Sequence, residues 1–510
     1  MLYTIVITAA NCPNTRQSSA EHFTRPAAPA GVAKGNGMNK YKRLVSNTIL
    51  TAINQFSSKL LGILMTAYYT RQLTTGEFGL MDTVQTTGQF FIPLVLLGIQ
   101  NAVVRFGLES RRSHHKIYTN GLVALGSGYL ILLIIWPILS QFDFIATSVG
   151  PYGALMLVFL LTSCFNTLNC QFTRAQGNLR LYAIDGILNS AVTLVCTVFY
   201  ISGLGLRPEG MLLAVITGDF ISAMFLFFAL RMWRFVSFRS FDKELMVRML
   251  RFSLPLVSAS ICWSITNTSD KLFITNILGP EATGLMSACY RLPTLLSIVA
   301  TMFTEAWQIS AFTDGSKAGR EAFFSRVFGI YQGIMFMAAA GIIWLCQPIM
   351  RVYVGKEFFS AWEFVPLFTF ATIFSSLSNF QNSIYMLEMK SGLSLLTMTV
   401  GAVLNLILNA ALIPSYGIQG AAIATAASYF VIFLIRAFST RRLLRMSYRP
   451  VSLAINVALL CIQSIILLMQ KENWAFWLTI ATYVTLLFNL KSFVDTVTVL
   501  LSRRKKRAKP

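Results

Sequence analysis

Fourteen apolar segments of about 20 residues constrain this chain more than any other feature of its sequence. They lie near residues 46–69, 80–104, 119–140, 152–173, 181–203, 210–230, 253–277, 284–311, 327–347, 362–386, 393–413, 417–437, 451–469 and 474–494. An α-helix needs about 20 such residues to cross the hydrocarbon core of a bilayer. Only 12% of the 510 residues are charged, about half the share typical of soluble globular chains. The sequence therefore predicts an all-α polytopic membrane protein with fourteen transmembrane helices.

The distribution of positive charge supports this number. If the N-terminus is cytoplasmic, the inside segments carry 31 Lys and Arg residues and the outside loops carry five, namely Arg71, Arg207, Arg351, Lys356 and Lys471. Cytoplasmic loops are enriched in Lys and Arg, and one missed helix would invert every later loop. We expect both termini in the cytoplasm of a bacterium, with the chain in the inner membrane. The net charge of +22 comes from these short loop clusters, so nucleic-acid binding is not indicated.

Weak internal repeats predict two halves. Residues 70–81 (TRQLTTGEFGLM) match residues 275–286 (TNILGPEATGLM) at an offset of 205, and two further pairs follow at offsets of 216 and 210. Repeats of six helices each have the same orientation in the membrane. We expect an N-terminal lobe at 44–250, a C-terminal lobe at 251–445, and two added helices with a basic tail at 446–510. Residues 1–37, rich in Ala, Pro, Ser and Gly, indicate a disordered tail or a misassigned start, with Met38 as the alternative to Met1.

Charged residues deep in the apolar segments are candidate functional groups, because a charge at the bilayer centre is costly and is retained for a reason. Lys59 lies in the middle of the first segment. Asn267 and Lys271 share one face of the seventh segment at i,i+4 spacing, with Asp270 adjacent. Arg291 and Glu305 lie about four turns apart on one face of the eighth. Two interpretations stay open: ion pairs between helices, for example Asp270 with Lys59, or a cation-lined cavity for an anionic cargo.

Other charges near segment ends have ordinary explanations. Asp82 and Asp185 lie near predicted helix starts, where a carboxylate complements the helix dipole. Arg105, Arg174 and Glu388 are close enough to segment ends to reach the headgroups.

The sequence offers few signs of catalysis. It has no CxxC pair, no Cys/His cluster and no GxxxxGK[ST] phosphate loop, and its three His residues are not deep in any segment. Short outside loops leave little room for a catalytic domain. A membrane-embedded polymerase or glycosyltransferase is therefore disfavoured, and we expect neither an enzyme nor a bound cofactor.

Three stretches carry a family resemblance: residues 57–81 (SSKLLGILMTAYYTRQLTTGEFGLM), 267–293 (NTSDKLFITNILGPEATGLMSACYRLP) and 405–428 (NLILNAALIPSYGIQGAAIATAAS). In their order and spacing, the chain resembles the polysaccharide-biosynthesis (Wzx-type) flippases of the multidrug/oligosaccharidyl-lipid/polysaccharide (MOP) superfamily. The resemblance implies a two-lobed fold with alternating access. It also implies an undecaprenyl-pyrophosphate-linked saccharide as cargo and, with it, polysaccharide-assembly proteins as partners.

The related lipid II flippases implicate two basic residues in handling pyrophosphate, and Lys59 and Arg291 occupy similar positions here. Met65 and Thr66 stand where those flippases have a second arginine and an adjacent aspartate, which argues against lipid II as the cargo. Our hypothesis is a lipid-linked oligosaccharide flippase. Lys59 and Arg291 would hold the pyrophosphate, with Lys271, Asp270, Glu305 and Asn267 beside them. The alternative is a cation-coupled, MATE-like multidrug antiporter.

Overall fold

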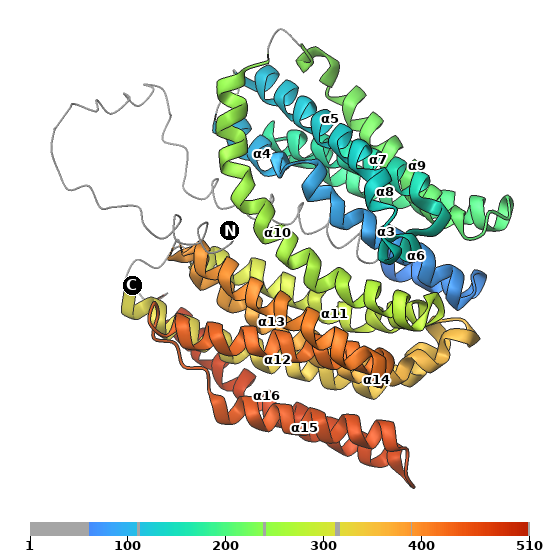
Figure 1. The fold of residues 1–510 in the computed structure, drawn as a ribbon. Helices are drawn as coiled ribbons and strands as arrows, with labels where there is room; N and C mark the ends of the chain where they lie inside the picture. The colour runs from blue at the N-terminus through green and yellow to red at the C-terminus, as the bar shows by residue number, and fades with distance from the viewer. Residues whose placement is uncertain (1–60, 110–112, 238–240, 312–316, 389, 508–510) are drawn as a thin grey trace, which may run out of the picture. The chain divides into compact units, whose positions relative to one another are not determined.

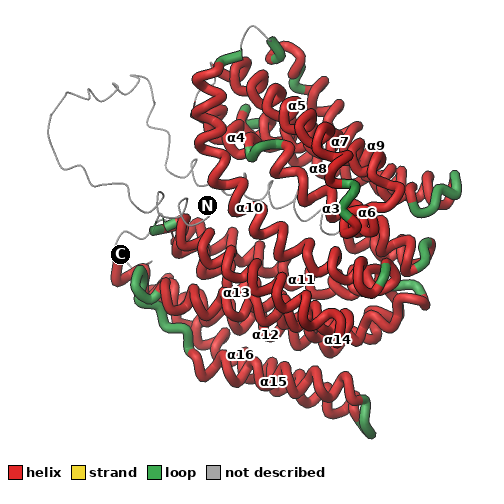
Figure 2. Tube along the Cα trace, in the orientation of Figure 1, coloured by secondary structure: helices red, strands yellow, loops and turns green. Residues whose placement is uncertain are grey.

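The computed structural model describes residues 61–109, 113–237, 241–311, 317–388 and 390–507 (Figure 1). Within those ranges the chain is helical and contains no strand (Figure 2). Residues 61–72 form the first described helix. It is followed by α3 (Thr75–Val95), α4 (Ile99–Glu109), α5 (His114–Leu139), α6 (Asp143–Val149), α7 (Gly153–Ala175), α8 (Leu179–Val198), α9 (Glu209–Ala229), α10 (Lys243–Leu278), α11 (Pro280–Ala311), α12 (Lys317–Tyr353), η6 (Lys356–Phe364), α13 (Val365–Leu387), α14 (Ser391–Thr440), α15 (Pro450–Met469) and α16 (Trp474–Arg507). The predicted tail at 1–37 lies outside the described residues.

Nine helices in the described ranges are long and apolar enough to cross a membrane, and α3 with α4 make a tenth if this pair, bent by 50°, is one span. The predicted segments 393–413 and 417–437 both fall in α14, and the last segment corresponds to a shorter apolar stretch, Trp474–Leu490. The first predicted segment is described only from residue 61 onward. The all-α membrane class is confirmed, and fourteen helices are consistent with this arrangement.

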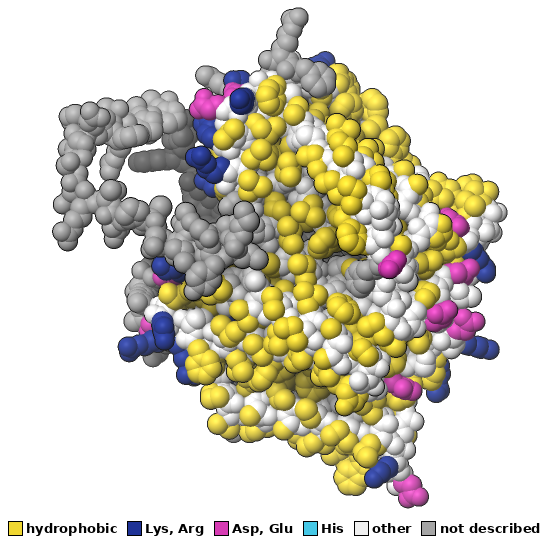
Figure 3. Space-filling model, viewed as in Figure 1, with side chains coloured by type: hydrophobic (Ala, Val, Ile, Leu, Met, Phe, Trp, Pro, Cys, Tyr) yellow, Lys and Arg dark blue, Asp and Glu magenta, His cyan; other side chains and the backbone are white. Residues whose placement is uncertain are grey.

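The surface of the molecule fits a bilayer. Apolar side chains cover the middle of the visible face, while charged side chains gather toward its ends (Figure 3). Ile134, Phe438 and Leu487 are 74%, 67% and 65% exposed. Exposing apolar area to water costs about 25 cal/mol per Å², a cost that disappears when lipid tails surround it. This surface is therefore explained by lipid contact.

Helix α14 is a hairpin of two helices. Gly417 has φ 58° and ψ −137°, which is not helical, and glycine adopts this conformation without steric cost. The two arms lie close together, since a Cβ on Gly420 would meet the carbonyl oxygen of Leu412 at 2.3 Å. Asn405 Nδ2 donates to Thr425 Oγ1 across the pair at 3.2 Å. Gly420, which has no side chain, therefore allows the two arms of the hairpin to pack closely.

Helices α3 and α11 cross at two glycines. A Cβ on Gly79 would lie 1.9 Å from the carbonyl oxygen of Pro280, and a Cβ on Gly284 would lie 2.1 Å from that of Thr75. These are the stretches that the sequence pairs at an offset of 205, and each repeat therefore contacts its own counterpart. The crossing brings the backbones together, so that side chains one turn further along both helices meet.

The other helices form groups around this crossing. Helices α7, α8 and α9 pack against one another, α13 and α14 pack against α10 and α11, and α15 and α16 pack against α12. Helix α3 contacts α7 as well as α10 and α11. The division into lobes at 44–250 and 251–445, with 446–510 as an addition, stays a prediction.

The break between α3 and α4 shapes an open cavity. Leu97 and Gly98 have positive φ values of 50° and 66°, and a Cβ on Gly98 would lie 2.5 Å from Val257 of α10. The bend places Gln100 and Asn101 on the wall of a cavity of about 810 Å³.

Candidate functional site

A carboxylate between two cations lies where α3, α10 and α11 meet. Lys271 of α10 forms an ion pair with Asp82 of α3, and Arg291 of α11 has its Nη2 atom 3.9 Å from Asp82 Oδ1. The side chains of Asp82, Lys271 and Arg291 are 6%, 19% and 32% exposed. We call these three residues the central charge cluster, and its formal charge is +1.

Polar neighbours fix the orientation of this cluster. Ser287 Oγ of α11 donates to Asp82 Oδ2 at 2.6 Å, and Lys271 Nζ donates to Thr86 Oγ1 at 3.0 Å. Asp82 is therefore satisfied by close donors, whereas Arg291 is held only at long range by this carboxylate and keeps more of its surface exposed. A charge buried in a low-dielectric region needs such partners. Arg291 is the cation of the cluster best placed to bind an added anion.

The prediction for Asp82 was wrong. Helix α3 begins at Thr75, behind a capping box made by Thr74 and Glu77, so Asp82 lies about two turns inside the helix rather than at its start. The apolar segment begins later than the helix, because the first two turns carry polar residues. The repeat offset of 205, which pairs Asp82 with Ser287, was the signal that could have placed this carboxylate at the crossing.

Asp270 faces a different set of partners from its neighbour Lys271. Asp270 Oδ1 accepts hydrogen bonds from Asn409 Nδ2 at 2.6 Å and Asn405 Nδ2 at 3.2 Å, and Oδ2 accepts one from Thr425 Oγ1 at 2.5 Å. Lys271 is therefore paired with Asp82 and not with the adjacent Asp270. Consecutive residues of an α-helix point about 100° apart, which turns Asp270 toward the α14 hairpin and Lys271 toward α3.

We call Asp270 with Asn405, Asn409 and Thr425 the Asp270 cluster. It contains oxygen atoms suited to a hard monovalent cation. Asp270 is 3% exposed, and the side-chain oxygen of Asn409 is buried with no hydrogen-bond partner. A carboxylate, an amide oxygen and the Thr425 hydroxyl are the ligand types that such ions accept. Within the described ranges, no group of three His, Cys, Asp or Glu residues is arranged to hold a metal ion.

Three predicted site residues cannot be placed with these. Lys59 lies outside the described residues, and so does any pairing of Lys59 with Asp270. Asn267 and Glu305 belong to helices α10 and α11, but the described part of the structure does not include their side chains. The structure thus brings together Lys271 and Arg291, and places Asp270 in a neighbouring cluster.

A second buried carboxylate cluster was missed from the sequence. Asp219 of α9 accepts hydrogen bonds from Asn166 Nδ2 at 3.1 Å, Asn189 Nδ2 at 2.9 Å and the Ser163 hydroxyl. Asp185, which is 2% exposed, accepts one from Ser222 at 2.7 Å. Its expected place at a helix start was wrong, since it lies nearly two turns into α8.

The repeat pattern contained the signal for this cluster. Asn189 and Asn405 occupy matching positions in the pair of stretches at offset 216. In the structure, each of these asparagines donates to a buried aspartate, Asp219 and Asp270 respectively.

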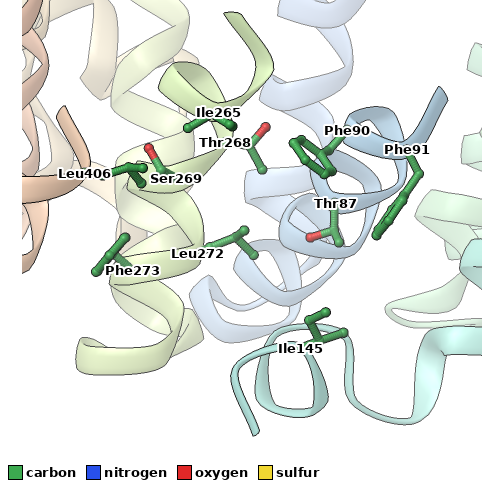
Figure 4. Close-up of a pocket in the computed structure, with 10 residues that line it drawn as sticks. All are labelled: Thr87, Phe90, Phe91, Ile145, Ile265, Thr268, Ser269, Leu272, Phe273 and Leu406. Atoms are coloured by element: carbon green, nitrogen blue, oxygen red, sulfur yellow. The ribbon is translucent and has the colours of Figure 1, made fainter. Parts of the chain in front are cut away.

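Two cavities lie among the same helices. The larger, of about 810 Å³, is lined by amide and hydroxyl side chains together with Arg105, Arg174 and Arg436. The smaller, of about 270 Å³, is apolar and lies between α3, α6, α10 and α14 (Figure 4). Phe90, Phe91 and Leu272 are among the side chains on its wall (Figure 4). A cavity lined by both polar and apolar side chains and a separate apolar pocket suit a ligand with both kinds of surface.

The sequence model of the family described as polysaccharide biosynthesis protein matches residues 44–308, more than half of the chain. The chain belongs to this family. No curated protein matches it by sequence.

Solved structures of MOP transporters share its fold. An inward-facing multidrug resistance MATE family transporter of the MOP superfamily is similar at a TM-score of 0.61 and 14% identity, over 76% of this chain and 95% of that one. The lipid II flippase MurJ, in an inward closed conformation, has a TM-score of 0.56 and 12% identity over 89% and 99%. A MOP superfamily transporter from Pyrococcus furiosus has a TM-score of 0.53 and 15% identity over 78% and 95%. The fold implied by the resemblance to this superfamily is confirmed, and the chain is a multi-pass membrane protein.

Proposed function

We propose that the protein moves an undecaprenyl-pyrophosphate-linked oligosaccharide from the cytoplasmic to the outer leaflet of a bacterial inner membrane, for the synthesis of cell-surface polysaccharide. The observation that carries this proposal is the central charge cluster, a site of net positive charge inside a membrane-spanning bundle. Arg291 donates charge-assisted hydrogen bonds to the pyrophosphate. Lys59 and Lys271 add positive charge, and Asp82 limits the net charge so that the anion is released.

Each of the two cavities suits a different part of the cargo, the apolar pocket the isoprenoid chain and the larger cavity the saccharide. Thr86 accepts a hydrogen bond from Lys271, and the next residue, Thr87, lines the apolar pocket. The apolar pocket that can hold an isoprenoid chain is therefore lined by the residue that follows a hydrogen-bond partner of Lys271. The saccharide fits the larger chamber, where amide and hydroxyl groups match the hydroxyl groups of a sugar.

Loading occurs from the cytoplasmic side. Arg105, Arg174 and Arg436 line the larger chamber, and the positive-inside rule assigns all three to cytoplasmic segments. The two lobes, residues 44–250 and 251–445, then rock against each other as rigid bodies, which gives alternating access. The partners at either end are polysaccharide-assembly enzymes, which supply the lipid-linked saccharide and consume it.

A cation-coupled multidrug antiporter is the second candidate, and the buried carboxylates Asp270 and Asp219 favour it. In the flippase, the Asp270 cluster serves as the site of a coupling cation, together with Glu305. The two functions differ in cargo charge: a cationic drug is repelled by the central charge cluster, whereas a pyrophosphate is attracted.

The test is transport in proteoliposomes, with lipid-linked saccharide in the inner leaflet and a probe for its arrival in the outer one. Arg291→Ala and Lys59→Ala should each slow flipping about tenfold or more, the loss expected when one charged hydrogen bond to a buried anion is removed. Lys471→Ala, which removes a loop cation away from the cluster, is the matched control. Normal flipping by both the Arg291 and the Lys59 variant would show that the cargo is not held by these cations.

A further inference from the structure

Four basic residues converge on one cavity at an end of the bundle. Arg71 lies at the end of the first described helix, Arg207 in the loop before α9, Arg351 in the last turn of α12 and Lys356 at the start of η6. They line a cavity of about 570 Å³. We call these four residues the outer basic pocket. Glu357 also lines it, which leaves a formal charge of +3.

These cations are not neutralised by neighbours. None of the four takes part in an ion pair within the part of the chain that the structure describes, and all four are exposed. Arg351 packs over the ring of Phe359, with 5.7 Å between Cζ and the ring centroid. A pocket with several unpaired cations has a positive potential and attracts anions.

The sequence makes this convergence unusual. Only five Lys and Arg residues fall in loops assigned to the outside, and the outer basic pocket contains four of them. The fifth, Lys471, lies in the turn between α15 and α16. Loops on this side are depleted of positive charge, yet nearly all that they retain gathers in one cavity.

We propose that the outer basic pocket is an anion site for a phosphate or pyrophosphate group, and that it receives the cargo's pyrophosphate as the cargo leaves the central charge cluster. The second part rests on the proposed function. Arginine binds such groups through two parallel hydrogen bonds. The anionic headgroup of a membrane phospholipid has the same chemistry and is the other source of this ligand.

The first described helix connects the two sites. A Cβ on Gly62 would lie 3.8 Å from Arg291 Nη1, and Arg71 follows nine residues later. At 1.5 Å per residue, Gly62 and Arg71 are about 14 Å apart along the helix axis. The central charge cluster and the outer basic pocket therefore adjoin the same helix at different depths.

Arg71 also closes this end of the bundle. Its Nη2 atom donates to the carbonyl oxygen of Val352 at 2.6 Å, and the backbone N–H of Gly355 donates to Thr70 Oγ1 at 3.3 Å. The first bond joins the first described helix to the last turn of α12, and the second joins it to the segment after α12. An anion in the pocket competes with Val352 for the Arg71 guanidinium and weakens this closure, so arrival of the pyrophosphate favours opening to the outside.

The test is calorimetric titration of inorganic pyrophosphate into the full chain in a neutral detergent. All proteins carry Arg291→Gln, so that binding at the central charge cluster is weakened. Adding Arg207→Gln and Arg351→Gln should reduce the affinity about tenfold or more, because two charge-assisted contacts are lost. Adding Lys471→Gln removes one charge on the same side of the membrane and should leave the affinity unchanged.

Repeating the titration in nanodiscs separates the two sources of the anion. If phospholipid headgroups occupy the pocket, phosphatidylglycerol should weaken pyrophosphate binding relative to phosphatidylcholine alone, and the Arg207/Arg351 variant should lose this difference. If the cargo is the source, the affinity is equal in both lipids. The proposal is overturned if pyrophosphate does not bind, if the double substitution leaves its affinity unchanged, or if Lys471→Gln weakens it as much. None of these titrations depends on transport, so a negative result here is distinct from a negative result in the flipping assay.

Discussion

Removing the carboxylate of Asp82 should reveal how strongly the central charge cluster holds α3 to α10. In Asp82→Asn, Lys271 loses its ion-pair partner and keeps only the Thr86 hydroxyl at 3.0 Å. The two side chains are 6% and 19% exposed, so solvent screens the charge poorly. Breaking a buried pair of this kind costs about 3–5 kcal/mol. Lys271→Met should cost a similar amount, because it leaves the Asp82 carboxylate with distant Arg291 and the Ser287 hydroxyl.

A double-mutant cycle measures the coupling directly. The free energy of unfolding is obtained by denaturant titration in mixed micelles for the wild type, Asp82→Asn, Lys271→Met and the double variant. We expect the double variant to be more stable than the sum of the two single losses by at least about 2 kcal/mol, since neither charge is then left unpaired. The exposed ion pair Lys116–Asp242, at 2.9 Å, is the control and should show much weaker coupling. Additive losses at Asp82 and Lys271 would refute the reasoning.

Three further predictions follow from other features. Gly284→Ala should lower the unfolding temperature and slow transport, because the added Cβ would meet the Thr75 carbonyl oxygen at 2.1 Å. Gly341→Ala is the control, since a Cβ there would meet nothing within 4 Å. Equal effects of the two substitutions would contradict the close crossing of α3 and α11. A cation bound at Asp270 would stabilise the folded state, so Na⁺ should raise the unfolding temperature of the wild type and not that of Asp270→Asn. An equal rise in both proteins would exclude this cation site. The pKa of the Asp242 carboxyl lies below its ordinary value, because the backbone N–H of Leu245 donates to it and Lys116 pairs with it. The contribution of this carboxylate to stability is therefore present above about pH 4 and is lost as the pH falls. In a plot of unfolding temperature against pH, Asp242→Asn should reduce the slope on the acid side. An unchanged slope would contradict this explanation.

The helices were predictable because apolar length is a local property of the sequence. The helix boundaries were less so, since polar residues open α3 and close α16, which continues to Arg507 beyond the predicted end at 494. The residues near 417 were correctly expected to separate two apolar segments, although nothing in periodicity alone indicated that the two would form a tight hairpin.

The candidate site was only partly predictable, because partners across helices depend on rotation about each helix axis. Lys271 and Arg291 were identified as buried charges, yet their shared partner Asp82 was assigned to a helix start. Asp219 was not predicted as a site residue, because its asparagine and serine donors come from two other helices. A sequence identifies which charges lie in the membrane, but the neighbour that satisfies each one is set by tertiary packing.

The crossing of α3 and α11 has a consequence for the origin of the chain. Two identical halves joined as a homodimer would meet there through an isologous contact, in which only residues on the two-fold axis face their own copies. Positions 82 and 287 would then carry the same residue, and two carboxylates at hydrogen-bonding distance would repel each other in a low-dielectric region. Fusion of the halves into one chain lets the two positions diverge. Asp82 and Ser287, 2.6 Å apart, form a donor–acceptor pair that a symmetric ancestor with two aspartates could not have made.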